Sequence, residues 1–278
     1  MNALATPELR QLMDGLFEAK SQGVSGANDF VGYFAPEKAN YLDATMGWRL
    51  GADPARAREL FATWKEGAHS YATRTLGDTD GAIVFMVDSA EMFGAEIRTI
   101  SSVDFEDGKI VRWVDYWSGR TWPAGLLKDL SVPADQWPAD LAEATVEERA
   151  DPAMRQIVTE LAAALADGDA DRAATLMSGD VEFDDLALNV HLTGRQPVHS
   201  FLHKALPLIP YGRGLSIRHV VGGRRGGGFE WTAAGRALPG ITALELDDDG
   251  RIARMTSTWD GGARDTDALV TLYRLTLV

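Results

Sequence analysis

The sequence predicts an α+β fold in which one domain type occurs twice in tandem. Residues 106–117 and 248–259 share an Asp-Gly turn, a basic residue, Ile, Arg and a closing Trp at identical spacing. The same offset of 142 positions relates Asp43 to Asp185, each at the end of a short apolar stretch. Each half also places its helices first and a run of strands afterwards, an order typical of α+β domains. The duplication is therefore the organising feature of the chain.

The first helix of each half is expected to begin at a capping residue followed by proline, Thr6-Pro7 and Asp151-Pro152. The cap side chain accepts a hydrogen bond from a free backbone amide, and proline suits the first helical position. Apolar residues then recur at helical spacing on one face, and a glycine follows each helix. A second short helix, a short strand and a third helix beginning at a Gly-x-x-Pro sequence complete this part of each half.

The remainder of each half alternates in polarity, as antiparallel strands do. Strands are expected at about 69–76, 82–91, 96–105 and 110–117, and again at about 214–221, 228–236, 240–246 and 251–259. The glycine-rich segment 222–228 lies between two of them and predicts a hairpin rather than a phosphate loop.

The predicted elements divide the chain into domains at 1–122 and 151–278, joined by a linker at 123–150. The linker is expected to end in an acidic helical run at 140–148. The apolar, β-prone tail at 268–278 is expected to pack onto a sheet edge or an interface.

Composition predicts a soluble, cytoplasmic protein without a nucleic-acid or membrane partner. The 278 residues are 45% hydrophobic and 24% charged, which suffices for two domain cores. The net charge of −14 opposes binding to nucleic acid and to anionic membranes. No cysteine is present, no apolar run approaches the ~20 residues of a membrane span, and the first residues lack the pattern of a signal peptide. His199 and His203 share a helix face, but without a third ligand we expect neither a metal site nor a cofactor.

Four features together resemble the SnoaL-like branch of the NTF2-like superfamily. They are the amphipathic opening helix, an aromatic-x-Asp ending the short strand, the Gly-x-x-Pro helix start, and Asp-Gly-basic-Ile running into a Trp. The resemblance covers both halves and implies two cone-shaped barrels, each a curved antiparallel sheet packed on about three helices. It also implies an intramolecular pseudo-dimer, with a homodimer as a further option. It selects no reaction, because the superfamily includes ketosteroid isomerases, polyketide cyclases, epoxide hydrolases and non-catalytic binding modules.

Asp43 occupies the place of the catalytic base in ketosteroid isomerase-like and polyether epoxide-opening enzymes, according to this resemblance. Tyr41 and Trp48 lie close in sequence and are expected to enclose the carboxyl group and raise its pKa by desolvation. The structural alternative is a turn former or helix cap, a common use of Asp at a strand end.

Asp115 and Asp88 are the other candidate acids of the first half. Asp115 matches the last-strand acid of limonene-type epoxide hydrolases, and Trp113 and Trp117 flank it on the same strand face. Asp88 lies near the position of their second acid. Those enzymes hold an arginine between the two acids, and Met86 stands at the matching position here, so the triad is incomplete. The structural alternatives are an Asp115 bonded to an indole and an Asp88 that faces solvent.

The second half repeats Asp43 as Asp185, but Ser257 replaces its last-strand acid. Glu230 is the candidate partner acid, because a carboxylate within an apolar strand is costly unless paired. A partner such as Arg218 would make Glu230 structural instead. The residues expected to bind substrate in this half are His191, Trp231 and Trp259.

These residues predict a cofactor-free acid–base enzyme acting on a hydrophobic, polyketide-like small molecule. The favoured reaction is epoxide opening with formation of a cyclic ether, in which a carboxylate deprotonates the attacking hydroxyl and a protonated acid assists the leaving oxygen. The alternatives are a polyketide cyclase or ketosteroid isomerase-like reaction with a single Asp base, and a non-catalytic ligand-binding or dimerisation module. Because Asp43 and Asp185 recur and Asp115 does not, we expect the recurring pair to be the centre of function.

Overall fold

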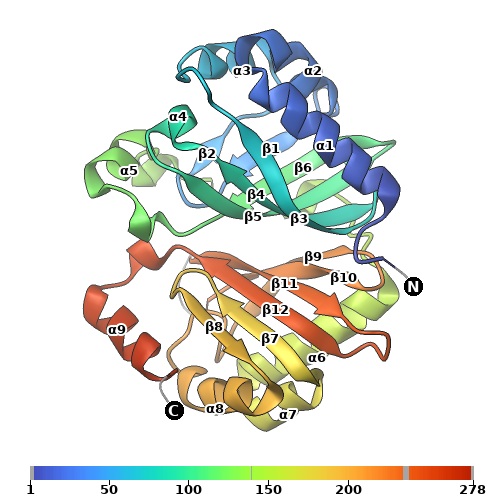
Figure 1. Ribbon diagram of the computed structural model, residues 1–278, viewed down its shortest axis with the longest axis vertical. Coiled ribbons are helices and arrows are strands. Elements are labelled where there is room, and N and C mark those ends of the chain that lie inside the picture. The colour runs from blue at the N-terminus through green and yellow to red at the C-terminus, as the bar shows by residue number, and fades with distance from the viewer. Residues whose placement is uncertain (1–2, 139, 234–237, 277–278) are drawn as a thin grey trace.

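Two six-stranded sheets lie face to face in the computed structural model, and each carries its helices on the opposite side (Figure 1). The structure describes residues 3–138, 140–233 and 238–276. The first half comprises α1 (Pro7–Ser21), α2 (Ala27–Gly32), β1 (Asn40–Asp43), β2 (Trp48–Arg49), α3 (Pro54–Phe61), β3 (Ser70–Gly77), β4 (Gly81–Asp88), α4 (Ala90–Phe93), β5 (Ile97–Glu106) and β6 (Lys109–Tyr116). The second comprises α6 (Pro152–Asp167), α7 (Ala170–Thr175), β7 (Met177–Asp185), β8 (Val190–Thr193), α8 (Arg195–Ala205), β9 (Ser216–Gly222), β10 (Gly226–Thr232), β11 (Pro239–Leu246), β12 (Ile252–Trp259) and α9 (Thr266–Arg274).

The two sheets have the same topology, so the duplication predicted from the sequence is present. Their strand orders are β2-β1-β6-β5-β4-β3 and β8-β7-β12-β11-β10-β9. Each sheet is mixed rather than purely antiparallel as expected, because β1 runs parallel to β6 and β7 runs parallel to β12. This parallel pairing sets Asp43 opposite Asp115 in the first sheet and Asp185 opposite Ser257 in the second.

Local capping chemistry begins the long helix of each half where the sequence predicts. The Thr6 hydroxyl accepts a hydrogen bond from the Leu9 amide at 3.3 Å, and the Asp151 carboxylate accepts one from the Ala153 amide at 2.8 Å. The apolar faces of these helices close the open side of each cone and build two separate cores. The predicted hairpin at the glycine-rich segment is also present, between β9 and β10.

A buried polar cluster joins the inner faces of the two sheets. The Arg112 guanidinium donates to both carboxylate oxygens of Glu230, at 2.7 and 2.6 Å, and to Asp104 at 3.1 Å. The Tyr116 hydroxyl donates to Glu230 at 2.6 Å, and the His219 ring contacts Asp104 at 2.7 Å. Aliphatic side chains from both sheets surround this cluster. Each sheet therefore covers the face of the other sheet that would otherwise be exposed to water.

The linker and the tail differ from expectation. The described residues that link the two domains in sequence form α5 (Ala124–Leu130) and short 3₁₀ turns, one of them at Glu143–Thr145, in place of the acidic helix predicted at 140–148. The tail forms α9 rather than a strand, and its Leu269 and Leu272 are buried against the second core. The predicted strand at 228–236 ends at Thr232, and part of that range lies outside the described residues.

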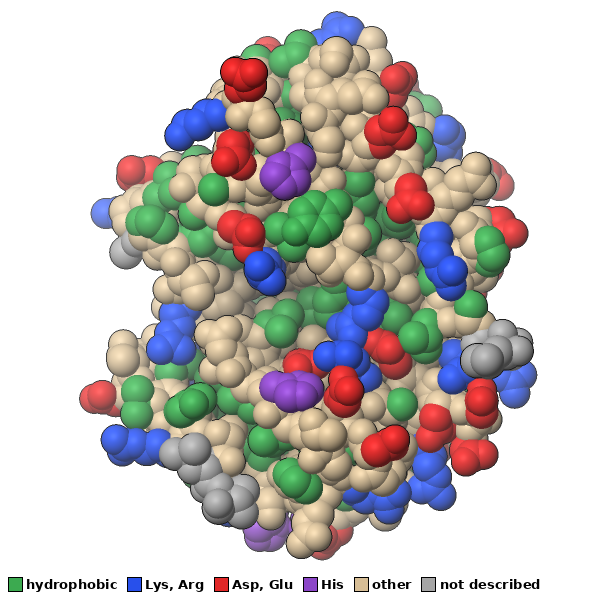
Figure 2. Space-filling view, viewed as in Figure 1, with side chains coloured by type: hydrophobic (Ala, Val, Ile, Leu, Met, Phe, Trp, Pro, Cys, Tyr) green, Lys and Arg blue, Asp and Glu red, His purple; other side chains and the backbone are tan. Residues whose placement is uncertain are grey.

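Within the described ranges, no helix combines the length and apolar character needed to cross a bilayer. On the face shown in Figure 2, basic side chains lie scattered among acidic ones rather than gathered into one patch.

Candidate functional site

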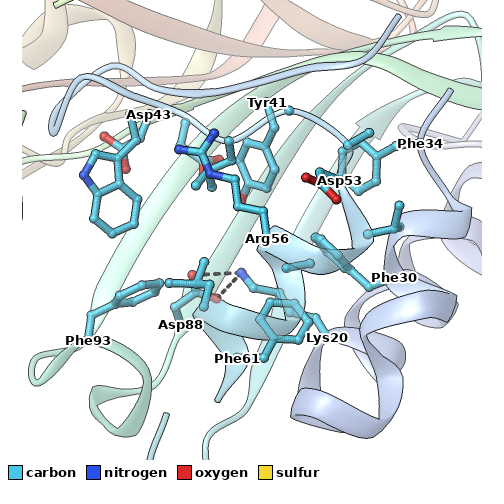
Figure 3. A pocket seen from close by; sticks show the side chains of 18 of the residues that line it. Lys20, Phe30, Phe34, Tyr41, Asp43, Asp53, Arg56, Phe61, Asp88 and Phe93 are labelled. Atoms are coloured by element: carbon cyan, nitrogen blue, oxygen red, sulfur yellow. Dashed lines mark hydrogen bonds and ion pairs between the residues drawn. The ribbon is translucent and has the colours of Figure 1, made fainter. Parts of the chain in front are cut away.

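A narrow cavity opens in the first domain between the sheet and the helices α1, α2 and α3 (Figure 3). Its empty space is about 740 Å³ with the open mouth included. The wall is mainly aromatic and aliphatic, including Phe30, Phe34, Trp48, Phe61, Trp64 and Phe93. Three carboxyl groups that the sequence analysis singled out, those of Asp43, Asp88 and Asp115, line the same cavity.

Asp43 lies at the end of β1, where the following turn folds back over its carboxyl group. One carboxylate oxygen accepts hydrogen bonds from the amides of Thr45 and Met46, at 2.8 and 2.6 Å. The other accepts one from the Trp117 indole nitrogen at 2.9 Å. Burial and the negative charge of Asp115 raise the pKa of Asp43 to about 7, although these donors oppose the rise. Asp43 is therefore close to half protonated at neutral pH.

Asp115 faces Asp43 from the neighbouring strand β6. Its Oδ1 accepts hydrogen bonds from the Ser101 hydroxyl at 2.5 Å and from the Trp113 indole nitrogen at 2.6 Å. Burial raises the pKa of Asp115 to about 6, while the Ser101 hydrogen bond and the positive charge of Lys20 oppose the rise. The expected indole contact and the expected cavity position thus occur together.

Asp88, at the end of β4, forms a buried ion pair with Lys20 of α1. The Lys20 ammonium lies 2.7 and 2.9 Å from the two carboxylate oxygens, and the Ser70 hydroxyl also donates to this carboxylate. Both charged side chains are only 6% exposed, so Asp88 does not face solvent. The cation beside the acids comes from a helix rather than from the strand position occupied by Met86.

Lys20 is a charged residue of the site that was not predicted from the sequence. It follows Leu16 by four positions and Met13 by seven, so it lies on the buried face of an amphipathic helix. A lysine at such a position is rarely buried without a partner acid. That spacing was a usable signal for a charged group inside the cone.

Figure 3 shows how these groups are arranged within the cavity. Tyr41 and Asp43 come from the strand side, and the Lys20–Asp88 pair lies below them with Phe61 and Phe93 beside it. Trp48 and Tyr41 line the cavity, whereas Trp113 and Trp117 are not among the lining residues and donate hydrogen bonds to Asp115 and Asp43.

Asp185 repeats the bonding of Asp43 in the second domain. It accepts hydrogen bonds from the Leu188 amide at 3.0 Å, the Tyr211 hydroxyl at 2.7 Å and the Trp259 indole nitrogen at 3.3 Å. Burial raises the pKa of Asp185 to about 6. The recurring bonds tie the turn after the short strand to the Trp that follows or ends the last strand, so the carboxyl group holds this turn in both domains.

Large side chains fill the interior around Asp185. Trp231 and Tyr211 are fully buried with ring centroids 5.7 Å apart, and Phe183 and Phe201 pack nearby at 5.4 Å. Strand pairing places Trp231 where the first sheet has Met86. Trp231 is therefore a core residue, and it is larger than Met86 at the matching position of the first domain.

Two further candidates of the second half lie away from a cone interior. Glu230 is in the cluster between the sheets, and its partner is Arg112 rather than Arg218, which pairs with Glu143. His191 is exposed and contacts Asp184 at 2.8 Å on the surface. Glu230 thus joins the domains, and neither residue meets Asp185. Among the described residues, no cluster of side chains has the composition of a metal site.

No family model matches the chain, and no curated protein matches it. Several solved structures are similar to it over less than half of its length. A steroid delta-isomerase from Pseudomonas aeruginosa is 19% identical, covering 47% of this chain and 93% of that chain, with a TM-score of 0.36. A protein with a cystatin-like fold from Silicibacter pomeroyi is 18% identical, covering 45% and 86%, with a TM-score of 0.37. A putative polyketide cyclase from Xanthomonas campestris is 22% identical, covering 38% and 88%, with a TM-score of 0.30. The chain is thus similar to NTF2-like, SnoaL-like, ketosteroid isomerase-like and polyketide cyclase proteins.

Proposed function

We propose that the first domain is a cofactor-free acid–base catalyst that opens an epoxide in a hydrophobic, polyketide-like molecule and closes a cyclic ether. The observation that carries this proposal is the pair Asp43 and Asp115. They lie opposite each other on adjacent strands, inside one aromatic cavity, with pKa values raised to about 7 and about 6. Between these values the pair holds one proton, so one carboxyl group can donate while the other accepts.

The proposed reaction gives each of the two acids one role. Asp115 is the more acidic group, so its carboxylate takes the proton from the hydroxyl of the substrate. The resulting oxygen attacks an epoxide carbon, the bond from that carbon to the epoxide oxygen breaks, and Asp43 protonates the leaving oxygen. The product is an isomer of the substrate. Proton transfer from Asp115 to Asp43 then restores the starting state.

The ion pair between Lys20 and Asp88 supports this division. The Lys20 ammonium lowers the pKa of Asp115 against the effect of burial and so keeps the base ionised. Asp88 fixes the ammonium through two hydrogen bonds. In this proposal Lys20 acts through Asp115 and is a positioning residue.

Proton transfer next to a carbonyl is the second candidate reaction. The Tyr41 hydroxyl lies beside Asp115, and burial together with the charge of that carboxylate and hydrogen bonding to it raises the pKa of Tyr41. A protonated Asp43 and the Tyr41 hydroxyl would be two donors for an enolate oxygen, with Asp115 as the base. A ketone that exchanges its α-hydrogen for deuterium in the presence of the protein would favour this candidate.

The test uses an aromatic epoxy-alcohol and follows formation of its cyclic ether. Asp43→Asn and Asp115→Asn should each lower turnover about 10²- to 10⁴-fold, the usual contribution of a general acid or base. Asp185→Asn is the matched control, because it changes an equally buried carboxyl group with similar hydrogen bonds in the second domain. Equal turnover in all three variants would refute the assignment.

A further inference from the structure

Two cations line the cavity among the residues that the structure describes, one of them buried and the other exposed to solvent. Lys20 is buried and paired with Asp88. Arg56 comes from α3, lines the mouth and is exposed to solvent. In Figure 3 the Arg56 side chain extends toward the side of the cavity where Asp43 and Tyr41 lie. The mouth therefore has a positive group that the proposed acid–base reaction does not use.

Arg56 has no acidic partner within the described parts of the chain: none of their side chains forms an ion pair or hydrogen bond with it. The acid closest in sequence that also lines the mouth is Asp53, which caps α3 by accepting a hydrogen bond from the Ala55 amide at 2.9 Å. Figure 3 shows its carboxylate on the other side of the Arg56 stem from the guanidinium. Arg74 and Arg254, by contrast, bind carboxylates at 2.6 to 2.9 Å.

The charge distribution favours one orientation of a ligand. The deep part of the cavity carries Asp43, Asp88 and Asp115 against one cation, Lys20, so an anionic group there would meet an excess of like charge. The apolar walls between these acids and the mouth suit an uncharged hydrophobic body. A planar guanidinium at the mouth suits a carboxylate, which it can bind through two parallel hydrogen bonds.

We infer that the substrate is a hydrophobic carboxylic acid whose carboxylate binds Arg56 at the mouth while its apolar body fills the cavity. This inference rests on the proposed function for the chemistry at the inner end of the molecule. It adds a substrate class and a specificity-determining residue. The carboxylate stays in contact with solvent and the reacting group reaches Asp43 and Asp115.

The experiment compares binding of phenylbutanoate with that of its neutral amide, phenylbutanamide, by calorimetry at pH 7. Trp48 and Trp64 line the cavity, so quenching of tryptophan fluorescence gives a second readout. We expect the acid to bind about twofold to fivefold more tightly than the amide, the upper part of the range for a solvent-exposed ion pair. Added salt should weaken binding of the acid and leave the amide unaffected.

Arg56→Gln should remove the preference for the acid, and Arg56→Lys should keep part of it. Arg58→Gln is the matched control, since Arg58 lies on the same helix and is exposed but does not line the cavity. Equal affinity for acid and amide, loss of the preference in the Arg58 variant, or no binding of either ligand would overturn the inference. If the protein turns over neither an epoxide nor a ketone but still prefers the acid, the result supports Arg56 as the residue that binds the carboxylate. It then refutes only the proposed reaction.

Discussion

Replacing Glu230 with Gln should destabilise the protein by about 3 kcal/mol. Burial alone would raise the pKa of Glu230, but the charge and hydrogen bonds of Arg112 hold it at about 2 instead of 4.5. At about 1.4 kcal/mol for each pKa unit, the ionised pair contributes about 3 kcal/mol to folding. Removing one partner of a buried pair costs about 3–5 kcal/mol in general. Because the folded-state pKa is the lower one, this stability is complete above pH 4.5 and is lost as the pH falls toward about 2.

Urea unfolding at pH 7, followed by tryptophan fluorescence, measures this loss. Glu245→Gln is the matched control, because Glu245 pairs with Arg74 across the same domain boundary at 2.6 Å but is partly exposed. We expect that change to cost no more than about 1 kcal/mol. The double change Arg112→Met with Glu230→Leu should not recover the loss, because it leaves the buried Tyr116 hydroxyl without its acceptor and Asp104 with His219 alone. A loss below about 1 kcal/mol in Glu230→Gln, or lost turnover at unchanged stability, would contradict a structural role for Glu230.

Three further predictions concern the two domains separately. Turnover should be greatest between about pH 6 and pH 7, because Asp115 gains a proton below this range and Asp43 loses one above it; a flat pH–rate profile would contradict the assigned pair. Lys20→Met should move the acidic limb of that profile to higher pH, because the ammonium no longer lowers the pKa of Asp115, and Lys20→Arg should restore it; an unmoved limb removes Lys20 from the mechanism. Trp231→Ala should cost about 3–5 kcal/mol of stability and leave turnover by the first domain unchanged at temperatures where the variant is folded. Loss of turnover without loss of stability would show instead that the second interior takes part in the reaction.

Local signals made most of the fold predictable. Caps, proline positions and Asp-Gly turns act over a few residues, so helix starts and hairpins could be placed from the sequence. The helix predicted at 140–148 does not form, because tertiary contacts override helix propensity there. Leu141 is buried and its carbonyl accepts a hydrogen bond from Arg112, while Ala142 has a positive φ of 60° that an α-helix cannot contain. The tail helix α9 has a cap at Asp265, a signal that its apolar composition obscured.

The candidate site was predictable in part. The acids of the first half share a cavity because strand alternation and the repeat place them on one face of the sheet. The prediction that Glu230 is the partner acid of Asp185 was wrong, because its partner Arg112 lies 118 positions away in the other domain. No local sequence pattern indicates such a contact. Recurrence of Asp43 as Asp185 was also a weaker functional signal than expected, since the repeated hydrogen bonds hold the turn in both domains. The residues that differ between the halves, Asp115 and Met86, distinguish the open interior from the filled one.

The two domains cover each other's sheets within one chain, and this arrangement affects how the sequence of the protein can evolve. In a dimer of identical subunits, every substitution appears twice, so a Trp at the position of Met86 would be present in both interiors. Fusion removes that constraint, and the second domain has Trp231 while the first keeps Met86 and its cavity. Substitutions in the second domain can therefore be selected for folding alone. Substitutions in the first domain can then be selected for binding of its ligand.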